Sequence, residues 1–169
     1  MQHRDWRELA EVAGFVTIVA VLVMIALEQR TANRIAQRAA EFDAQHRIAS
    51  LYADMYQARA GNPEVAKVFA KISSPQGHLI TATDTSQIRA IAQQYINLYR
   101  FAQAAYDNGL LPQDRYEQMQ ADLQSAIERY PGLQPALVSL YESLSEPESL
   151  PILEPISRLA EDTAAGAAE

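Results

Sequence analysis

The stretch VAGFVTIVAVLVMIAL, which runs from Val12 to Leu27, sets the architecture expected for this 169-residue chain. Its 16 residues carry no charge, and Glu11 and Glu28 bound it. As a helix it would be about 24 Å long, against a bilayer core of roughly 30 Å. Flanking residues and local thinning of the bilayer can meet the difference. The sequence therefore predicts a transmembrane helix over residues 9–28, after a short N-terminal tail over residues 1–8.

Other interpretations fit this stretch less well. A buried helix of a soluble protein is rarely apolar on every face, and an amphipathic surface helix needs a polar face. A cleavable signal peptide has a basic start and a small-residue cleavage site. Here acids accompany Arg4 and Arg7, and the stretch is followed by Glu28-Gln29-Arg30 with no convincing small-residue cleavage site. A single uncleaved span is therefore expected, with Trp6 as an aromatic residue at the membrane interface.

Basic residues on the two sides of the span indicate its orientation. Arg30, Arg34 and Arg38 follow it closely, and basic residues favour the cytoplasmic side. These three arginines are also expected at the membrane interface, near anionic headgroups, although they are fewer than specific lipid recognition needs. Twelve Arg against two Lys, with abundant Ala, suggest a bacterial source. The expected location is the bacterial inner membrane, with the C-terminal part in the cytoplasm.

The residues after the span favour a continuous helix. From Phe15 to Ala60 there is no Gly or Pro, and residues 28–60 are rich in strong helix formers. The transmembrane helix is therefore expected to continue into a long helical stalk over residues 29–47. Two interpretations of the stalk stay open. It could form a homo-oligomer through a short heptad pattern, or its end could pack on the following domain while the rest is solvated. The heptad positions are Ile35, Phe42, Ala49 and Tyr56.

Turn signals divide the next part of the chain into helices. Gly61 suits the left-handed position that ends a helix, Asn62 can cap the next helix, and Pro63 fits its first turn. No segment alternates with period two over a useful length, so no sheet is expected. The predicted fold class is all-α, with a small helical bundle over residues 48–144. The first expected helix covers residues 63–72, and a long second helix is capped by Thr83 or Asp84 and ended by Asp107-Asn108-Gly109. A third runs from about Pro112 to Tyr130-Pro131-Gly132. The last has an apolar face made of Leu133, Leu137, Leu140 and Leu144.

The order of these caps and core positions resembles that of bacterial single-pass membrane protein families of unknown function. The resemblance rests on Asn62-Pro63-Glu64 with Phe69, on Tyr99-Arg100-Phe101, on Gly109-Leu110-Leu111 and on Tyr130-Pro131-Gly132-Leu133, and it covers about residues 10–145. It implies an N-terminal span before a small helical domain. It implies no activity, because those families have none assigned.

Acidic residues collect at the C-terminal end. The formal net charge is −7, and residues 142–169 contribute seven acids against Arg158 alone. With Pro147, Pro151 and Pro155, this region is expected to be a Pro/Glu/Ala-rich acidic tail over residues 145–169 that is mostly solvated. A short apolar part of it could dock, or it could order on a partner. The rest of the chain is nearly neutral and shows no basic patch, so no nucleic-acid partner is expected.

No motif points to catalysis. The chain has no cysteine, no phosphate loop and no nucleophile elbow. Asp43 and His46 share a helix face, but a di-iron bundle needs several such pairs. A stripe of tyrosines is interpreted as core rather than as an aromatic pocket; it comprises Tyr95, Tyr99, Tyr106, Tyr116, Tyr130 and Tyr141. No catalytic, cofactor or metal residue is assigned.

The leading hypothesis is a membrane-anchored, non-enzymatic interaction protein, such as an accessory subunit of a larger bacterial membrane complex, with the bilayer and an unidentified protein as partners. The alternative is a membrane-tethered sensor or regulator whose helical domain binds a small ligand or a cytosolic protein. An enzyme with an unrecognised site is a third reading.

Overall fold

In the computed structural model the described residues are 2–74 and 80–166, and the side chains of residues 2–10 and 12 fall outside that description. The regular elements in these two ranges are all helical, and neither range contains a strand. The chain divides into two compact units, Met1–Phe42 and Asp43–Glu169. The all-α prediction, with a long N-terminal helix followed by a small helical bundle, is confirmed.

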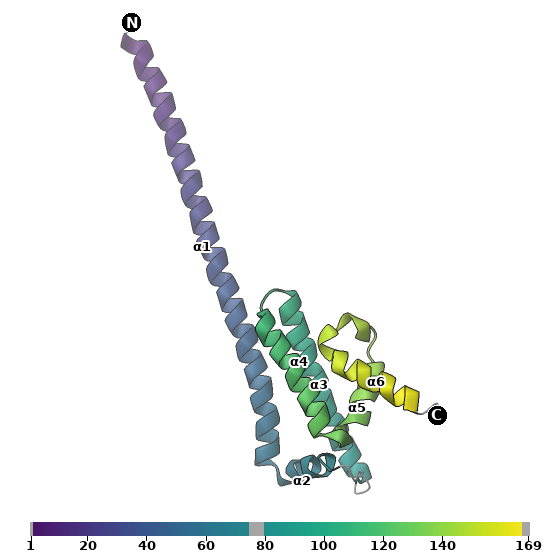
Figure 1. The fold of residues 1–169 in the computed structure, drawn as a ribbon. Helices are drawn as coiled ribbons and strands as arrows, with labels where there is room; N and C mark the ends of the chain where they lie inside the picture. The colour runs from purple at the N-terminus through teal and green to yellow at the C-terminus, as the bar shows by residue number, and fades with distance from the viewer. Residues whose placement is uncertain (1, 75–79, 167–169) are drawn as a thin grey trace. The chain divides into compact units, whose positions relative to one another are not determined.

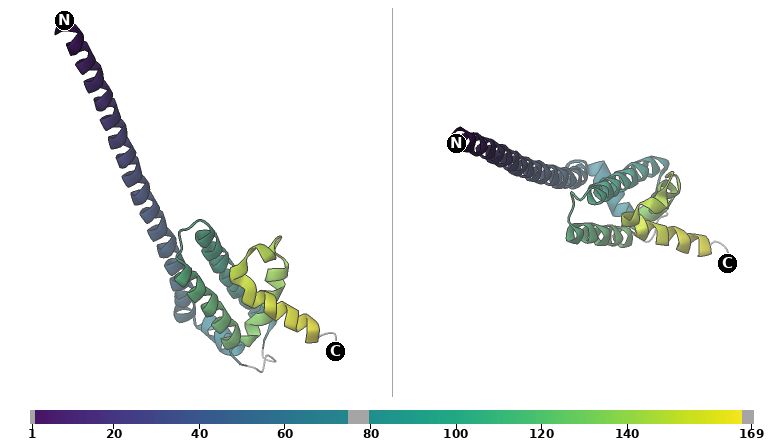
Figure 2. Two further views of the ribbon diagram at one scale, coloured as in Figure 1. Left: turned by 45° about the horizontal axis from the view of Figure 1, so that its top comes forward. Right: turned by 90° about the horizontal axis from the view of Figure 1, so that it is seen from above.

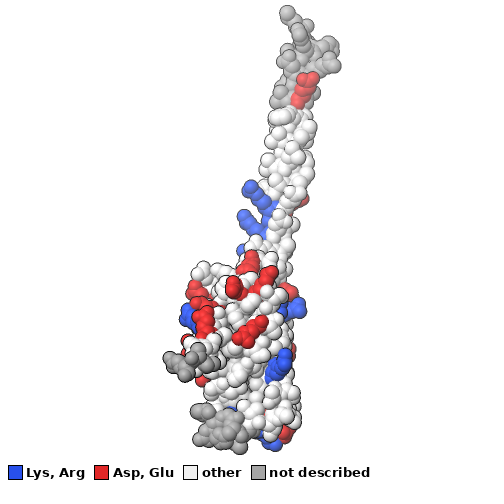
Figure 3. Space-filling view, turned by 90° about the vertical axis from the view of Figure 1, so that its right-hand side faces the viewer, with Lys and Arg blue, Asp and Glu red and all other residues white. Residues whose placement is uncertain are grey.

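The first unit is the greater part of helix α1, whose bounds are Gln2–Gly61 (Figure 1). Its apolar stretch is exposed on every face. All ten large apolar side chains from Phe15 to Leu27 have 42–68% of their surface exposed. Figure 3 shows this part of the helix as a surface without charged residues. The hydroxyl of Thr17 donates to the Ala13 carbonyl at 2.8 Å, so the helix itself satisfies the hydroxyl. Within the described residues one helix, α1, is long and apolar enough to cross a membrane.

The second unit is a bundle built around α3. It comprises residues 43–61 of α1, α2 (Pro63–Ile72), α3 (Ala82–Asp107), α4 (Gln113–Arg129), α5 (Gln134–Glu142) and α6 (Glu154–Gly166), with the short 3₁₀ turns η2 (Pro131–Leu133), η3 (Pro147–Ser149) and η4 (Pro151–Leu153). Helix α3 packs against α2, α4, α5 and η4. Figures 1 and 2 show α3 and α4 side by side from different directions. Tyr99, Leu98 and Ile96 of α3 are fully buried in this arrangement.

Side-chain and glycine caps set the ends of these helices. The Asn62 side chain accepts a hydrogen bond from the Glu64 amide at 3.0 Å, and α2 covers the predicted residues 63–72. Gly109, at φ 68°, ends α3, because the Leu110 amide donates to the Ala105 carbonyl and the Gly109 amide to that of Tyr106. This is a Schellman motif, in which glycine takes the left-handed position without strain.

Two predicted caps are wrong. The cap of α3 is Thr81 rather than Thr83 or Asp84, and Asp84 instead completes a capping box with Thr81. A tertiary contact explains the position of this cap. Lys71 of α2 forms an ion pair with Asp84 at 2.6 Å and holds that carboxylate at the start of α3. Gly61 ends α1 with no positive φ, so the left-handed conformation expected there is absent.

The bundle begins earlier in the chain than expected. The predicted border between stalk and domain lies between residues 47 and 48, whereas the compact unit starts at Asp43. Ala44 and Ile48 are buried, at 5% and 8% exposure, and Leu51 and Met55 pack against the core. The heptad positions Ile35, Phe42 and Tyr56 are 64–71% exposed, so the side chains of α1 that are buried in the bundle are others.

The expected acidic tail is largely part of the fold. Ile152, Leu153 and Ile156 are fully buried, and residues 147–166 form η3, η4 and α6. The Ile152 amide donates to the side chain of Gln103, a buried residue of α3, at 3.0 Å. The apolar part of this region, which was expected to be able to dock, therefore completes the core, and a mostly solvated tail is incorrect for residues 147–156. The acids of the segment, such as Glu148 and Asp162, are exposed.

A candidate binding cleft among four helices

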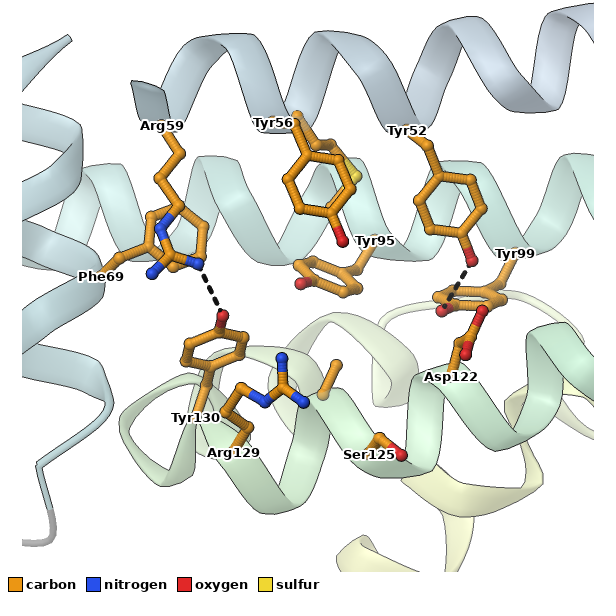
Figure 4. Close-up of a pocket in the computed structure, with 12 residues that line it drawn as sticks. Tyr52, Tyr56, Arg59, Phe69, Tyr95, Tyr99, Asp122, Ser125, Arg129 and Tyr130 are labelled. Atoms are coloured by element: carbon orange, nitrogen blue, oxygen red, sulfur yellow. Dashed lines mark hydrogen bonds between the residues drawn. The ribbon is translucent and has the colours of Figure 1, made fainter. Parts of the chain in front are cut away.

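A cleft of about 190 Å³ opens between the end of α1 and helices α2, α3 and α4 (Figure 4). All its residues belong to the unit that starts at Asp43. Tyr52, Tyr56 and Arg59 of α1 form one wall; they stand at i, i+4 and i+7 and therefore share one helix face. The opposite wall comes from α4 and the base comes from α3.

The base of the cleft is aromatic and buried. Tyr95 and Tyr99 of α3 are 9% and 0% exposed, and their ring centroids lie 6.4 Å apart at an interplanar angle of 21°. At one end, Phe69 of α2 meets Tyr130 edge to face, with centroids 5.4 Å apart. Rings in these arrangements attract each other beyond their burial. They form an aromatic floor on which a flat group can lie.

The hydroxyl groups along this floor stay neutral in water near pH 7. Burial raises the pKa of Tyr95 to about 12 and raises the pKa of Tyr99 well above its usual range. The Tyr52 hydroxyl lies 3.5 Å from that of Tyr99, and burial also raises the pKa of Tyr52. A neutral phenol both donates and accepts hydrogen bonds, so the floor carries polar groups without charge.

Charged side chains form the rim. The guanidinium of Arg59 donates to the Tyr130 hydroxyl at 2.9 Å and lies 5.0 Å from the centroid of the Phe69 ring. Arg129 of α4 extends toward the middle of the cleft (Figure 4). Asp122 stands at the other end, beside Tyr52 and Tyr99. Two cations against one carboxylate favour a ligand that carries negative charge.

The tyrosines of the predicted stripe fall into two groups in the structure. Tyr95, Tyr99 and Tyr130 are buried, as predicted for core residues, but they also line the cleft. Tyr106 instead stacks on Tyr116, with ring centroids 4.2 Å apart, and the Tyr116 hydroxyl donates to Gln103 at 2.8 Å. The interpretation of the stripe as core and not pocket is therefore incomplete.

The predicted membrane-interface residues lie elsewhere. Arg30, Arg34 and Arg38 are exposed on α1 in the first unit, and their spacing of four places them along one side of the helix. The side chain of Trp6 lies outside the described residues. Asp43 and His46 are exposed on α1, and within residues 2–74 and 80–166 no group of three His, Asp or Glu side chains is placed to hold a metal ion.

Sequence reasoning missed the α1 and α4 walls of the cleft. The spacing of Tyr52, Tyr56 and Arg59 was a usable signal, since it puts two aromatic rings and a cation on one helix face. Arg129 and Asp122 carried no such signal, because their role depends on where α4 packs.

Comparison of the chain with protein-family models, with curated proteins and with solved structures finds no match. The resemblance to single-pass membrane protein families stays a prediction, and function is argued from the residues of the chain itself.

Proposed function

We propose that this chain is a single-pass membrane protein that works by binding a partner and not by catalysis. The observation that carries the proposal is the exposure of all ten large apolar side chains from Phe15 to Leu27. In water such a continuous apolar surface would drive aggregation, whereas lipid tails solvate it favourably. The folded bundle that follows on the same chain would then be held at a membrane surface.

The proposed location is the bacterial inner membrane, with the bundle in the cytoplasm. Arg30, Arg34 and Arg38 are exposed just after the apolar stretch, where cytoplasmic basic residues are favoured. Reporter fusions at residues 2 and 169 test this orientation. A C-terminal reporter that is active only in the cytoplasm supports it, and one that is active only after export contradicts it.

The proposed role is that of an accessory subunit of a larger membrane complex. The apolar span and the surface of the bundle would each offer contacts to a larger partner. Purification of the tagged protein from its native membrane in mild detergent, followed by mass spectrometry, tests this role. One partner recovered in stoichiometric amount supports it. Recovery of the chain alone, or of its own copies only, contradicts it and would instead favour self-association through α1.

A second candidate function is a membrane-tethered sensor, which the cleft favours. A ligand in the cleft would contact Tyr52, Tyr56 and Arg59 of α1 and Arg129 of α4 together. Occupancy would therefore stabilise the packing of α1 on the bundle. A thermal-shift screen of the full chain in detergent tests this function, since a ligand that binds the folded state raises its melting temperature. A screen in which no small molecule raises it contradicts the sensor.

A further inference from the structure

We propose that the cleft binds a small aromatic carboxylate, with the ring on the tyrosine floor and the carboxylate between Arg59 and Arg129. This inference deepens the sensor function and rests on it for the use of the cleft. It goes further by assigning the chemical class of the ligand. Size, charge and the direction of the cleft each support the assignment.

The volume of the cleft limits the ligand to one ring. A cavity of about 150 Å³ lined by apolar side chains holds a benzene molecule. The cleft measures about 190 Å³, which leaves room for a ring and one small substituent. Tyr95 lies in the middle of the floor, and the hydroxyl end of Tyr56 on α1 points toward it (Figure 4). A flat ring that lies against Tyr95 would gain aromatic contact there.

Arg129 is the group that selects an anion. Within the described residues no hydrogen bond or ion pair is found for its guanidinium, and the side chain is exposed at the cleft mouth. Arg59, by contrast, is already held by Tyr130 and Phe69, which fixes the position of its charge. One guanidinium held in place and one available guanidinium can bind a carboxylate from two sides, and bonds between ions are the stronger class of hydrogen bond.

The two ends of the cleft differ in charge, which orients the ligand. Asp122 and Arg129 are seven residues apart on α4, and Tyr52 and Arg59 are seven apart on α1, or about 10 Å along each helix. Arg59 makes one end cationic, and the Arg129 guanidinium extends from α4 toward the middle of the cleft (Figure 4). The other end, with Asp122 beside Tyr52, repels a second carboxylate and suits a hydrogen-bond donor. The ligand is therefore a monocarboxylate and not a dicarboxylate.

Isothermal titration calorimetry of the full chain in detergent micelles, with benzoate as the probe, tests the assignment. Benzamide has the same shape without the charge, and cyclohexanecarboxylate has the charge without the aromatic ring. We expect benzoate to bind in a one-to-one complex at least tenfold more tightly than either. Empty micelles correct for partitioning of the probes into detergent.

Two variants locate the binding. Arg129→Gln removes the available cation from the rim and is expected to weaken benzoate at least tenfold, with the melting temperature of the unliganded protein unchanged. Arg100→Gln is the matched control, because Arg100 is an exposed arginine of α3 that does not line the cleft, and it should bind benzoate like the unaltered chain.

Several results overturn the assignment. They are no binding of benzoate, equal binding of benzamide, and benzoate binding that Arg129→Gln leaves unchanged. If a neutral or cationic molecule raises the melting temperature through this cleft, the aromatic carboxylate is wrong and the sensor function stands. If no small molecule raises it, both fail.

Discussion

The guanidinium of Arg59 donates a hydrogen bond of 2.9 Å to the hydroxyl of Tyr130, a residue 71 positions later in the chain. The bond joins the last turns of α1 to the end of α4. It also places a cation over the Phe69 ring of α2, so three helices meet at one side chain. The packing of α1 on the bundle and the shape of the cleft therefore depend on the same contact.

Loss of the Tyr130 hydroxyl should weaken this junction. Tyr130→Phe keeps the ring against Phe69 and is expected to lower the free energy of unfolding by about 1 kcal/mol, the usual net value of one hydrogen bond. Arg59→Met removes the donor while keeping the aliphatic stem. Denaturant unfolding of both single variants and the double variant measures the coupling, and strictly additive effects would contradict a direct interaction.

Gln103 should be the polar residue on which docking of the C-terminal segment depends. Its side-chain oxygen accepts from the Ile152 amide and the Tyr116 hydroxyl, and its nitrogen donates to Asp107. Gln103→Leu leaves the buried Ile152 amide and Tyr116 hydroxyl unpaired, at a cost of about 1–3 kcal/mol for each. Limited proteolysis should then cut between α5 and η4 faster. Gln93→Leu, on the exposed face of α3, is the control and should change stability by less than about 0.5 kcal/mol. Equal cleavage of both variants would refute the role of Gln103.

Gly132 should tolerate no side chain. A Cβ at this position would lie 2.8 Å from the Cα of Ile72, a fully buried residue of α2, so backbone would have to move. Gly132→Ala is expected to destabilise the protein by about 1–3 kcal/mol, as overpacking usually does. Gly61→Ala meets no atom within 4 Å and serves as the control. Equal melting temperatures of the two variants would show that the backbones of η2 and α2 do not approach each other this closely.

The Lys71–Asp84 pair should make stability depend on acid pH. The hydrogen bonds from Lys71 and Thr81 lower the pKa of Asp84 from 3.8 to about 2. A depressed pKa means that the folded state holds the carboxylate charged, so this contribution is complete above about pH 4 and is lost as the pH falls to about 2. The stability difference between the unaltered chain and Asp84→Asn should therefore shrink over that range. A difference that stays constant with pH would contradict the pairing.

The cap that Thr81 provides should stabilise the protein at every pH. Its side chain accepts from the Asp84 amide and caps α3. Thr81→Ala should cost about 1 kcal/mol in the free energy of unfolding, whereas Thr83→Ala, at the cap position expected from sequence, should cost much less. Chemical denaturation of the two variants checks this, and equal losses would contradict the assignment of the cap.

Local signals explain which helices could be predicted. Asn62, Pro63 and Glu64 act within one turn, so the sequence alone sets the start of α2. The cap of α3 could not be chosen in the same way, since Thr81, Thr83 and Asp84 are all suitable cap residues. The contact with Lys71, on another helix, makes the difference.

Non-local packing explains what the sequence did not reveal. The prolines and acids of residues 145–169 predicted a mostly solvated tail with a short apolar part that could dock. Where Ile152 docks could not be predicted, because its burial depends on the positions of Gln103 and α3. The cleft also depends on non-local packing, because Arg59, Arg129 and Tyr95 come from three helices that must first pack together. The sequence pattern predicted the aromatic side chains of α3, but it did not predict that α1 and α4 form the walls of a cleft above them.

Flotation of the full chain on a density gradient, after an alkaline carbonate wash of the membranes, tests whether residues 9–28 anchor the protein in a bilayer. We predict that the chain floats with lipid, because the exposed side chains from Phe15 to Leu27 are held in the bilayer. Val19→Arg with Leu22→Arg, each costing about 2.5–3.5 kcal/mol at the centre of a span, should abolish flotation. A full chain that remains soluble without detergent, or a double variant that floats as well as the unaltered chain, would contradict the membrane anchor.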